Sequence, residues 1–288
     1  MHVGACLAEP YNEAWCAVEY YEANGEILKM LLEYTCPDSE HRGRTLICHA
    51  VLCRNSGAVG ALLDAGANAE FCVRTKNGHE FFPLHMAARM GCHIIIKKFI
   101  EQNCDLNART ETGETALMLC AKANHQECFM ELLVAGADLG LVNMAGQNAV
   151  SIAEESGFAS SVHQILWDTL KAGQKINSSD LQVFSPLHFV ARFGDTVVLQ
   201  KLLQQSDIYL NEQDRYGYSA AMIAAIEGHI EVFKVLVFAG ADLSLTNKKG
   251  ETAIVLSEAH GCKDVIERVL LEAVLANKLK EEEFKALH

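Results

Sequence analysis

Apolar residues in this chain recur as pairs of short stretches, with a glycine or an asparagine between the two members of each pair. In the first stretch, leucine and alanine follow one another at helical spacing, and such small residues let neighbouring helices approach closely. The second stretch carries adjacent leucines, as at Leu132-Leu133 and Leu202-Leu203. The pattern predicts helix–turn–helix pairs in which a residue such as Gly91 or Gly228 breaks the chain between two helices.

Three sets of markers repeat along the chain with one period. The residues between paired helices stand 33, 33, 37, 34 and 33 positions apart; they are Gly91, Asn124, Gly157, Gly194, Gly228 and Gly261. Glycines that close a hairpin tip are 33 apart in the pairs Gly113–Gly146 and Gly217–Gly250. The third marker is Gly-Ala-Asp or a variant of it, beginning at Gly66, Asn103, Gly136 and Gly240. A shared 33-residue period predicts a repeat protein.

The opening of each repeat resembles the ankyrin family. The openings include Pro83-Leu84-His85, Thr115-Ala116-Leu117, Ser185-Pro186-Leu187-His188 and Thr252-Ala253-Ile254. Serine or threonine suits the cap of the first helix, and proline suits its first turn. The resemblance covers nearly the whole chain and implies an all-α ankyrin-repeat solenoid of about eight helix–turn–helix units joined by short β-hairpin fingers. Segments such as 137–143 are similar to a group of long plant ankyrin proteins, which implies a plant source.

The register predicts one repeat domain over 1–288, because a single unit cannot bury its own apolar face and stacking has to supply the core. Its units are expected at about 10–40, 41–72, 73–108, 109–141, 142–179, 180–212, 213–245 and 246–280. The fifth unit is expected to have an extended second helix and then a longer loop. No polar cap is evident at either end, so we expect a fragment of a longer repeat protein, with apolar surface exposed at both ends.

Charge and cysteine usage narrow the class of protein. The formal net charge is −13, and basic pairs such as Lys97-Lys98 and Lys248-Lys249 are isolated, so nucleic-acid binding is not expected. No stretch approaches the roughly 20 apolar residues that span a bilayer. The 11 cysteines occur singly, mostly inside apolar runs, which indicates reduced thiols and a cytoplasmic or nuclear protein.

Candidate chemistry is sparse. His85 and His188 are candidates for general bases, but the resemblance implies that both rings instead bind backbone groups of adjoining turns. The densest set of metal-ligand types lacks the paired, regular spacing of a zinc site; it consists of Cys36, His41, Cys48, His49 and Cys53. Neither a nucleotide-binding glycine motif nor a nucleophile elbow is found. We therefore expect no catalytic, cofactor or metal site, and a chain that is not an enzyme.

The remaining candidate for function is the surface. The resemblance implies that a partner binds a concave face built from hairpin tips and first helices. Arginines and exposed aromatics are frequent interface anchors. The candidates are Arg192, Phe193, Arg215 and Tyr216, followed by Arg89, Met90 and Lys76. Packing between repeats is the competing explanation for Phe193 and Tyr216.

These positions predict a scaffold for protein–protein interaction whose partner presents an acidic, partly apolar segment. In the alternative, the repeats form a regulatory or substrate-recruiting region of a larger enzyme, such as a ubiquitin ligase or kinase, or of a channel. The activity would then lie outside these residues.

Overall fold

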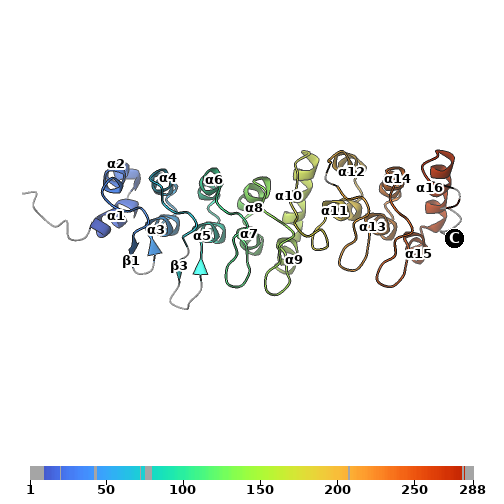
Figure 1. Ribbon diagram of the computed structural model, residues 1–288, viewed down its shortest axis with the longest axis horizontal. Helices are drawn as coiled ribbons and strands as arrows, with labels where there is room; N and C mark the ends of the chain where they lie inside the picture. The colour runs from blue at the N-terminus through green and yellow to red at the C-terminus, as the bar shows by residue number, and fades with distance from the viewer. Residues whose placement is uncertain are drawn as a thin grey trace, which may run out of the picture. The chain divides into compact units, whose positions relative to one another are not determined.

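The computed structural model describes residues 10–19, 21–41, 44–71, 73–74, 80–206, 208–280 and 282. These residues contain sixteen α-helices and four two-residue strands (Figure 1). The helices that open each pair, called first helices below, are α1 Pro10–Glu19, α3 Leu46–Leu52, α5 Pro83–Met90, α7 Ala116–Ala123, α9 Ala149–Glu155, α11 Pro186–Phe193, α13 Ala220–Ile226 and α15 Ala253–Ala259. The second helices are α2 Tyr21–Leu32, α4 Ser56–Asp64, α6 His93–Glu101, α8 Gln126–Val134, α10 Ala159–Lys171, α12 Thr196–Leu203, α14 Ile230–Phe238 and α16 Lys263–Leu275. The all-α repeat fold is confirmed.

The strands form two short antiparallel hairpins in the first fingers. β1 Glu40–His41 pairs with β2 Arg44–Thr45, and β3 Val73–Arg74 pairs with β4 Glu80–Phe81. The later fingers are held by tight turns instead, with one isolated bridge between Gln213 and Ser219.

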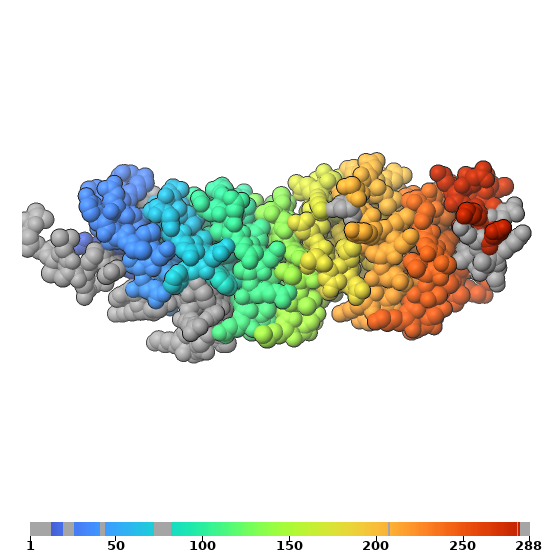
Figure 2. Space-filling model, viewed as in Figure 1, coloured from blue at the N-terminus to red at the C-terminus, as the bar shows by residue number. Residues whose placement is uncertain are grey.

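Contacts divide the chain into two units. The N-terminal unit comprises Met1–Asp138 and Val142–Ile165, and the C-terminal unit comprises Leu139–Leu141 and Leu166–His288, so the division falls within α10. In each unit, the main helix contacts join the members of a pair, such as α7 with α8, or equivalent helices of successive pairs, such as α13 with α15. Consecutive repeats of each unit accordingly adjoin as bands of colour in Figure 2. Such nearest-neighbour packing is typical of a solenoid.

First helices supply the most thoroughly buried positions. In α7 every residue from Ala116 to Ala121 is buried, and in α13 the same holds from Ala220 to Ala225. Second helices add large side chains with no exposed surface, such as Phe233 in α14. Full burial of one such ring contributes about 1.5–3 kcal/mol.

A polar ladder joins successive linkers between the repeats. In each rung, a side-chain oxygen of one linker accepts a hydrogen bond from a backbone N–H about one repeat further on. The rungs run from Asn68 to Asp38 at 2.7 Å, from Asp105 to Glu70 at 3.1 Å, from Asp138 to Asn107 at 2.9 Å and from Asp242 to Asn211 at 2.8 Å, the donor named first. The backbone N–H at the Asp or Asn of the repeated motif is thus satisfied by an acidic or amide side chain of the preceding linker, where a loop would otherwise leave it to water.

The expected longer loop after α10 is wrong. α10 is extended to 13 residues, as predicted, but the segment from it to α11 covers 172–185, the same length as 135–148 between α8 and α9. The extra residues all lie in the helix. The segment packs so closely on Gly140 that a Cβ there would lie 2.4 Å from the Asp180 nitrogen. The segment 172–185 lacks the Gly-Ala-Asp motif, and its backbone instead lies directly against Gly140, where only a residue without a Cβ fits.

Apolar side chains are exposed on the outermost helix pairs. Ile27 and Met30 are exposed on α2, and Leu271 and Leu275 are exposed on α16. Interior helices also expose apolar side chains, such as Ile94 on α6 and Val134 on α8, so the expected exposure at the two ends stays a prediction.

Candidate partner-binding surface

The finger between α12 and α13 ends in a tight turn built around Asp214. Its carboxylate accepts hydrogen bonds from the backbone nitrogens of Tyr216 at 2.8 Å and Tyr218 at 2.9 Å. Gly217 follows with a φ of 83°, which a residue with a Cβ rarely adopts. The turn fixes the backbone and leaves the side chains of Arg215 and Tyr216 exposed at the tip.

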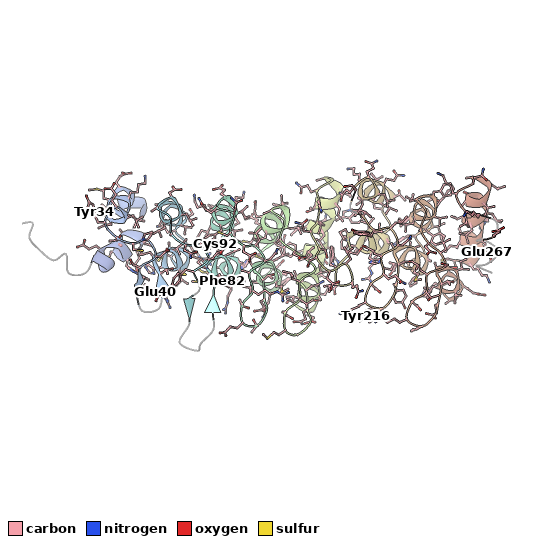
Figure 3. All side chains as sticks on the ribbon, viewed as in Figure 1. Tyr34, Glu40, Phe82, Cys92, Tyr216 and Glu267 are labelled. Atoms are coloured by element: carbon pink, nitrogen blue, oxygen red, sulfur yellow. The ribbon has the colours of Figure 1, made fainter. Side chains whose placement is uncertain are left out.

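Two neighbouring tips of the C-terminal unit form one basic surface. The Arg215 Cζ lies 4.9 Å from the centroid of the Tyr216 ring, within the range of a cation–π contact. The backbone N–H of Lys248 donates to the Tyr216 carbonyl at 3.0 Å, which joins this tip to the next one. Lys248 and Lys249 are exposed. We call Arg215, Tyr216, Lys248 and Lys249 the basic fingertip; Figure 3 labels Tyr216 on these loops.

Arg192 and Phe193 lie at the end of α11, as expected. The Phe193 ring centroid is 4.7 Å from that of Phe189 and 5.9 Å from that of Trp167, yet 44% of Phe193 is exposed. Arg192 is exposed, and its carbonyl accepts a hydrogen bond from His229 Nε2 at 2.9 Å. Phe193 thus packs between repeats and also presents surface. The contact of Phe193 with Trp167, which lies in the preceding repeat, was not predicted from the sequence.

The remaining candidates belong to the N-terminal unit. Arg89 is exposed and Met90 is half-buried at the end of α5. The Arg89 carbonyl interacts with His125 Nε2 at 3.2 Å, the equivalent of the contact at Arg192. Lys76 lies outside the described residues.

His85 has the structural role that was predicted for it. It is fully buried, and its Nε2 lies 3.0 Å from the Ala108 carbonyl and 3.2 Å from the Glu114 carbonyl. Burial lowers the pKa of the ring, although those two carbonyls and the charge of Glu114 partly oppose the shift. A neutral ring that donates to backbone carbonyls binds the next finger to α5.

His188 agrees only in part with that prediction. It is buried, and burial lowers its pKa against the raising influence of Asp214 and the carbonyl of Glu212. Its Nε2, however, finds no hydrogen-bond partner of normal geometry among the described residues. The predicted bond to the backbone is therefore confirmed at His85, whereas at His188 the carbonyls of Glu212 and Tyr218 raise the pKa of the ring but form no bond of normal geometry with Nε2.

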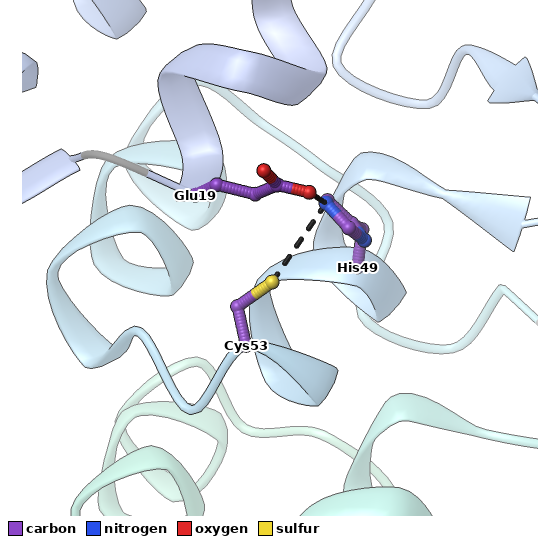
Figure 4. A group of neighbouring side chains, drawn as sticks. All are labelled: Glu19, His49 and Cys53. Carbon is purple, nitrogen blue, oxygen red and sulfur yellow. Dashed lines mark hydrogen bonds and ion pairs between the residues drawn. The ribbon is translucent and has the colours of Figure 1, made fainter.

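Two members of the Cys/His set come together with a residue that was not predicted. His49 on α3 and Cys53 at its end meet Glu19 at the end of α1 (Figure 4). The distance from Glu19 Oε1 to His49 Nε2 is 3.2 Å, and from His49 Nε2 to Cys53 Sγ it is 3.7 Å. Cys48 is buried in the core, Cys36 is exposed, and the His41 side chain lies outside the described residues.

The environment favours the neutral forms of both His49 and Cys53. Burial lowers the pKa of His49 against the influence of Glu19, and burial together with Glu19 raises the pKa of Cys53. Glu19 precedes Cys53 by 34 residues, which is about one repeat. Residues one repeat apart lie on adjacent units, so this spacing could have indicated that the two are neighbours.

Comparison with known proteins identifies the repeats. A family model described as "Ankyrin repeats (3 copies)" matches residues 84–180 and 152–247, which together cover more than half of the 288 residues. Ankyrin repeat protein nuc-2 of Neurospora crassa is 28% identical over 88% of this chain and 24% of its own length. The probable E3 ubiquitin-protein ligase XBOS33 of Oryza sativa is 27% identical over 59% of this chain and 34% of its own length. The chain thus spans about a quarter to a third of these relatives.

A solved structure of the same kind covers most of the chain. The crystal structure of the ankyrin repeat domain of Bcl-3 matches 88% of this chain and 96% of its own at 22% identity, with a TM-score of 0.45. Among the described residues, no helix has the length and apolar character needed to cross a membrane.

Proposed function

Because this chain belongs to the ankyrin-repeat family, whose repeats mediate protein–protein interaction, we propose that it is a non-catalytic scaffold that binds a protein partner through its C-terminal unit. The basic fingertip is the main contact in this proposal, and Arg192 with Phe193 at the end of α11 is the second. A cytoplasmic or nuclear location belongs to the same proposal, because the cysteines of the sequence occur singly and mostly inside apolar runs.

The charge of the basic fingertip carries the proposal. Three cations and one exposed aromatic ring gather on two hydrogen-bonded tips of a chain whose net charge is −13. Such a local reversal of charge steers an acidic segment to this place and repels one that is basic. The Tyr216 ring, 55% exposed, offers apolar area beside the cations. The partner is therefore proposed to present an acidic, partly apolar segment.

The test is affinity capture from cell extract followed by substitution. Proteins retained by the wild-type chain are identified, and the affinity of each is measured for the double variant Arg215→Ala, Tyr216→Ala. Loss of interface anchors of this type costs about 2 kcal/mol or more, near thirtyfold in Kd. The matched control is Arg89→Ala with Met90→Ala in the N-terminal unit, which is expected to leave the Kd unchanged. The reverse result places the contact in the N-terminal unit.

A second candidate function is supported by the names of the relatives. XBOS33 and the E3 ubiquitin-protein ligase KEG of Arabidopsis thaliana, 32% identical over 126 residues, both carry a stretch similar to this chain. The chain corresponds to 34% and 7% of their lengths. In this second proposal the repeats belong to a larger enzyme of plant origin, and they either recruit its substrate or regulate its activity. The full-length transcript decides it, because a catalytic domain must be encoded beside the repeats.

A further inference from the structure

The cluster of Glu19, His49 and Cys53 combines three chemical types of metal ligand. A carboxylate oxygen, an imidazole nitrogen and a sulfur lie within 4.8 Å of one another. Zinc takes these three donor types with bonds of about 2.0–2.3 Å in a tetrahedral arrangement. Two ligand atoms of such a tetrahedron lie about 3.3–3.6 Å apart, and the two distances measured to His49 Nε2 are 3.2 and 3.7 Å.

We propose that Glu19, His49 and Cys53 form a zinc-binding site that joins the first two repeats, with the fourth coordination position open to water. The donor set decides the metal, because a sulfur and an imidazole select borderline-soft ions over magnesium or calcium, which prefer oxygen ligands. An open fourth position is the feature that separates such a site from a closed four-ligand structural one.

The surroundings hold the ligands in place before any ion binds. The Asn55 amide donates to the Val18 carbonyl at 2.9 Å, so the end of α1 that carries Glu19 is fixed against the turn after Cys53. The Asn55 side-chain oxygen also accepts from the Ala58 nitrogen at 3.0 Å and caps α4. The Trp15 ring lies 4.2 Å from the His49 ring and restrains its rotation. Ligands held by neighbours in this way bind a metal with less loss of entropy.

Figure 4 shows that the three ligands come from two elements. Glu19 is on α1, while His49 and Cys53 are four residues apart on α3 and its cap, hence on one face of that helix. A bound ion would therefore bridge two adjacent repeats. Its binding is expected to stabilise the packing of α1 on α3 in addition to occupying the ligands.

Cobalt serves as the spectroscopic probe, and zinc as the competitor. The purified, reduced chain is titrated with Co²⁺, and one equivalent is expected to give the thiolate-to-cobalt charge-transfer band and the visible bands of tetrahedral cobalt. Zinc is expected to displace it. Cys53→Ser is expected to abolish the charge-transfer band, and Glu19→Gln and His49→Gln to weaken binding at least tenfold. Zinc is also expected to raise the Tm of the wild-type chain but not that of Cys53→Ser.

Two controls use cysteines outside the cluster. Cys16→Ser and Cys36→Ser remove exposed thiols near the N-terminus and are expected to keep the full cobalt spectrum. A spectrum lost in either control assigns the ion to other thiols and overturns the proposal. So does a wild-type chain that gives no charge-transfer band, in which case the three side chains form only a hydrogen-bonded link. That wild-type measurement decides the matter even where a variant fails to fold.

Discussion

Two helices of this chain begin with the same three residues, Pro-Leu-His, and lie in different units. α5 in the N-terminal unit and α11 in the C-terminal unit both have eight residues, and both end at a glycine in the left-handed region. At each of these glycines, a Cβ would lie within 3 Å of a histidine ring of the next repeat. Gly91 faces His125, and Gly194 faces His229. The close packing at the end of the helix is thus the same in both units.

The start of the helix differs between the two units. His85 binds two carbonyls of the following finger, whereas His188 Nε2 has no such bond among the described residues. Ser185 at the head of α11 supplies the connection instead: its hydroxyl donates to the Glu212 carboxylate in the next finger. Phe82 at the head of α5 has no side-chain cap. One motif can therefore be tied to its neighbour by either of two residues, depending on what the next finger presents.

Replacement of the two histidines is expected to have the largest effect on the free energy of unfolding, and the two losses are expected to be unequal. His85→Ala leaves the Ala108 and Glu114 carbonyls without their buried donor, so we expect a loss of about 3 kcal/mol in the free energy of unfolding. His188→Ala is expected to cost about 2 kcal/mol, because the loss there is mainly the packing of a buried ring. Urea unfolding of both variants measures the two values, and hydrogen exchange over 108–114 locates the damage. Equal losses would contradict the distinction between the two rings.

The second largest effect on stability is expected from the residues at the ends of the same two helices, Phe193 on α11 and Met90 on α5. Phe193→Ala removes a ring that lies against two other aromatic rings, each such pair contributing about 0.5–1.5 kcal/mol, so a loss of about 2 kcal/mol is expected. Met90→Ala is expected to cost less than about 1 kcal/mol, since Met90 is only half-buried. Phe193→Leu keeps apolar area without aromatic contacts and should fall between them. Thermal unfolding of the three variants gives the order, and a Phe193→Ala loss no larger than that of Met90→Ala would refute it.

Most of the fold could be predicted from the 33-residue period, because the glycines of the turns and the residues that cap the helices can be recognised locally in the sequence of each repeat. Thr115 and Thr252 cap their helices where the openings placed them. The pairings across repeats were harder to predict. Glu19 lies one repeat before Cys53, but nothing local marks it as a neighbour of His49. Likewise, the resemblance predicted a backbone bond for His85 but not its acceptors, because the exact path that brings the Ala108 and Glu114 carbonyls to the ring is not encoded in the motif at Pro83-Leu84-His85.

The helix caps are expected to show a smaller effect. Ser185 Oγ accepts from the His188 nitrogen at 3.1 Å, and loss of such a cap costs about 1 kcal/mol, so Ser185→Ala should be less stable by this amount. Ser185→Thr keeps a hydroxyl and should recover most of it. Hydrogen exchange at the His188 amide is the local measurement. Unchanged exchange in Ser185→Ala would mean that Pro186 alone fixes the start of α11.

Acidification is expected to give the smallest effect, because it protonates the two histidines first in the unfolded chain and leaves both buried rings in place. Burial lowers the pKa of His85 and of His188 below the usual 6.5. The folded chain then binds fewer protons than the unfolded chain, so the stability from these rings is complete above about pH 6.5 and falls as the pH drops toward the lowered pKa. We expect a lower free energy of unfolding at pH 5.5 than at pH 7.5, with a flatter dependence in His85→Gln.

The two units should differ in this pH dependence, because only α11 has Glu212 beside it. Burial raises the pKa of Glu212 while its bond to Ser185 opposes the shift, so the folded chain takes up a proton there more readily than the unfolded chain. That uptake stabilises the fold as the pH falls and offsets part of the loss caused by His188. Glu212→Gln removes the offset, and we expect acid to destabilise α11 more in this variant than in the wild-type chain. Hydrogen exchange of α5 and α11 at both pH values, corrected for the intrinsic rates, measures the two units separately. The same acid loss at α11 with and without Glu212 would show that this carboxylate stays ionised over the whole range.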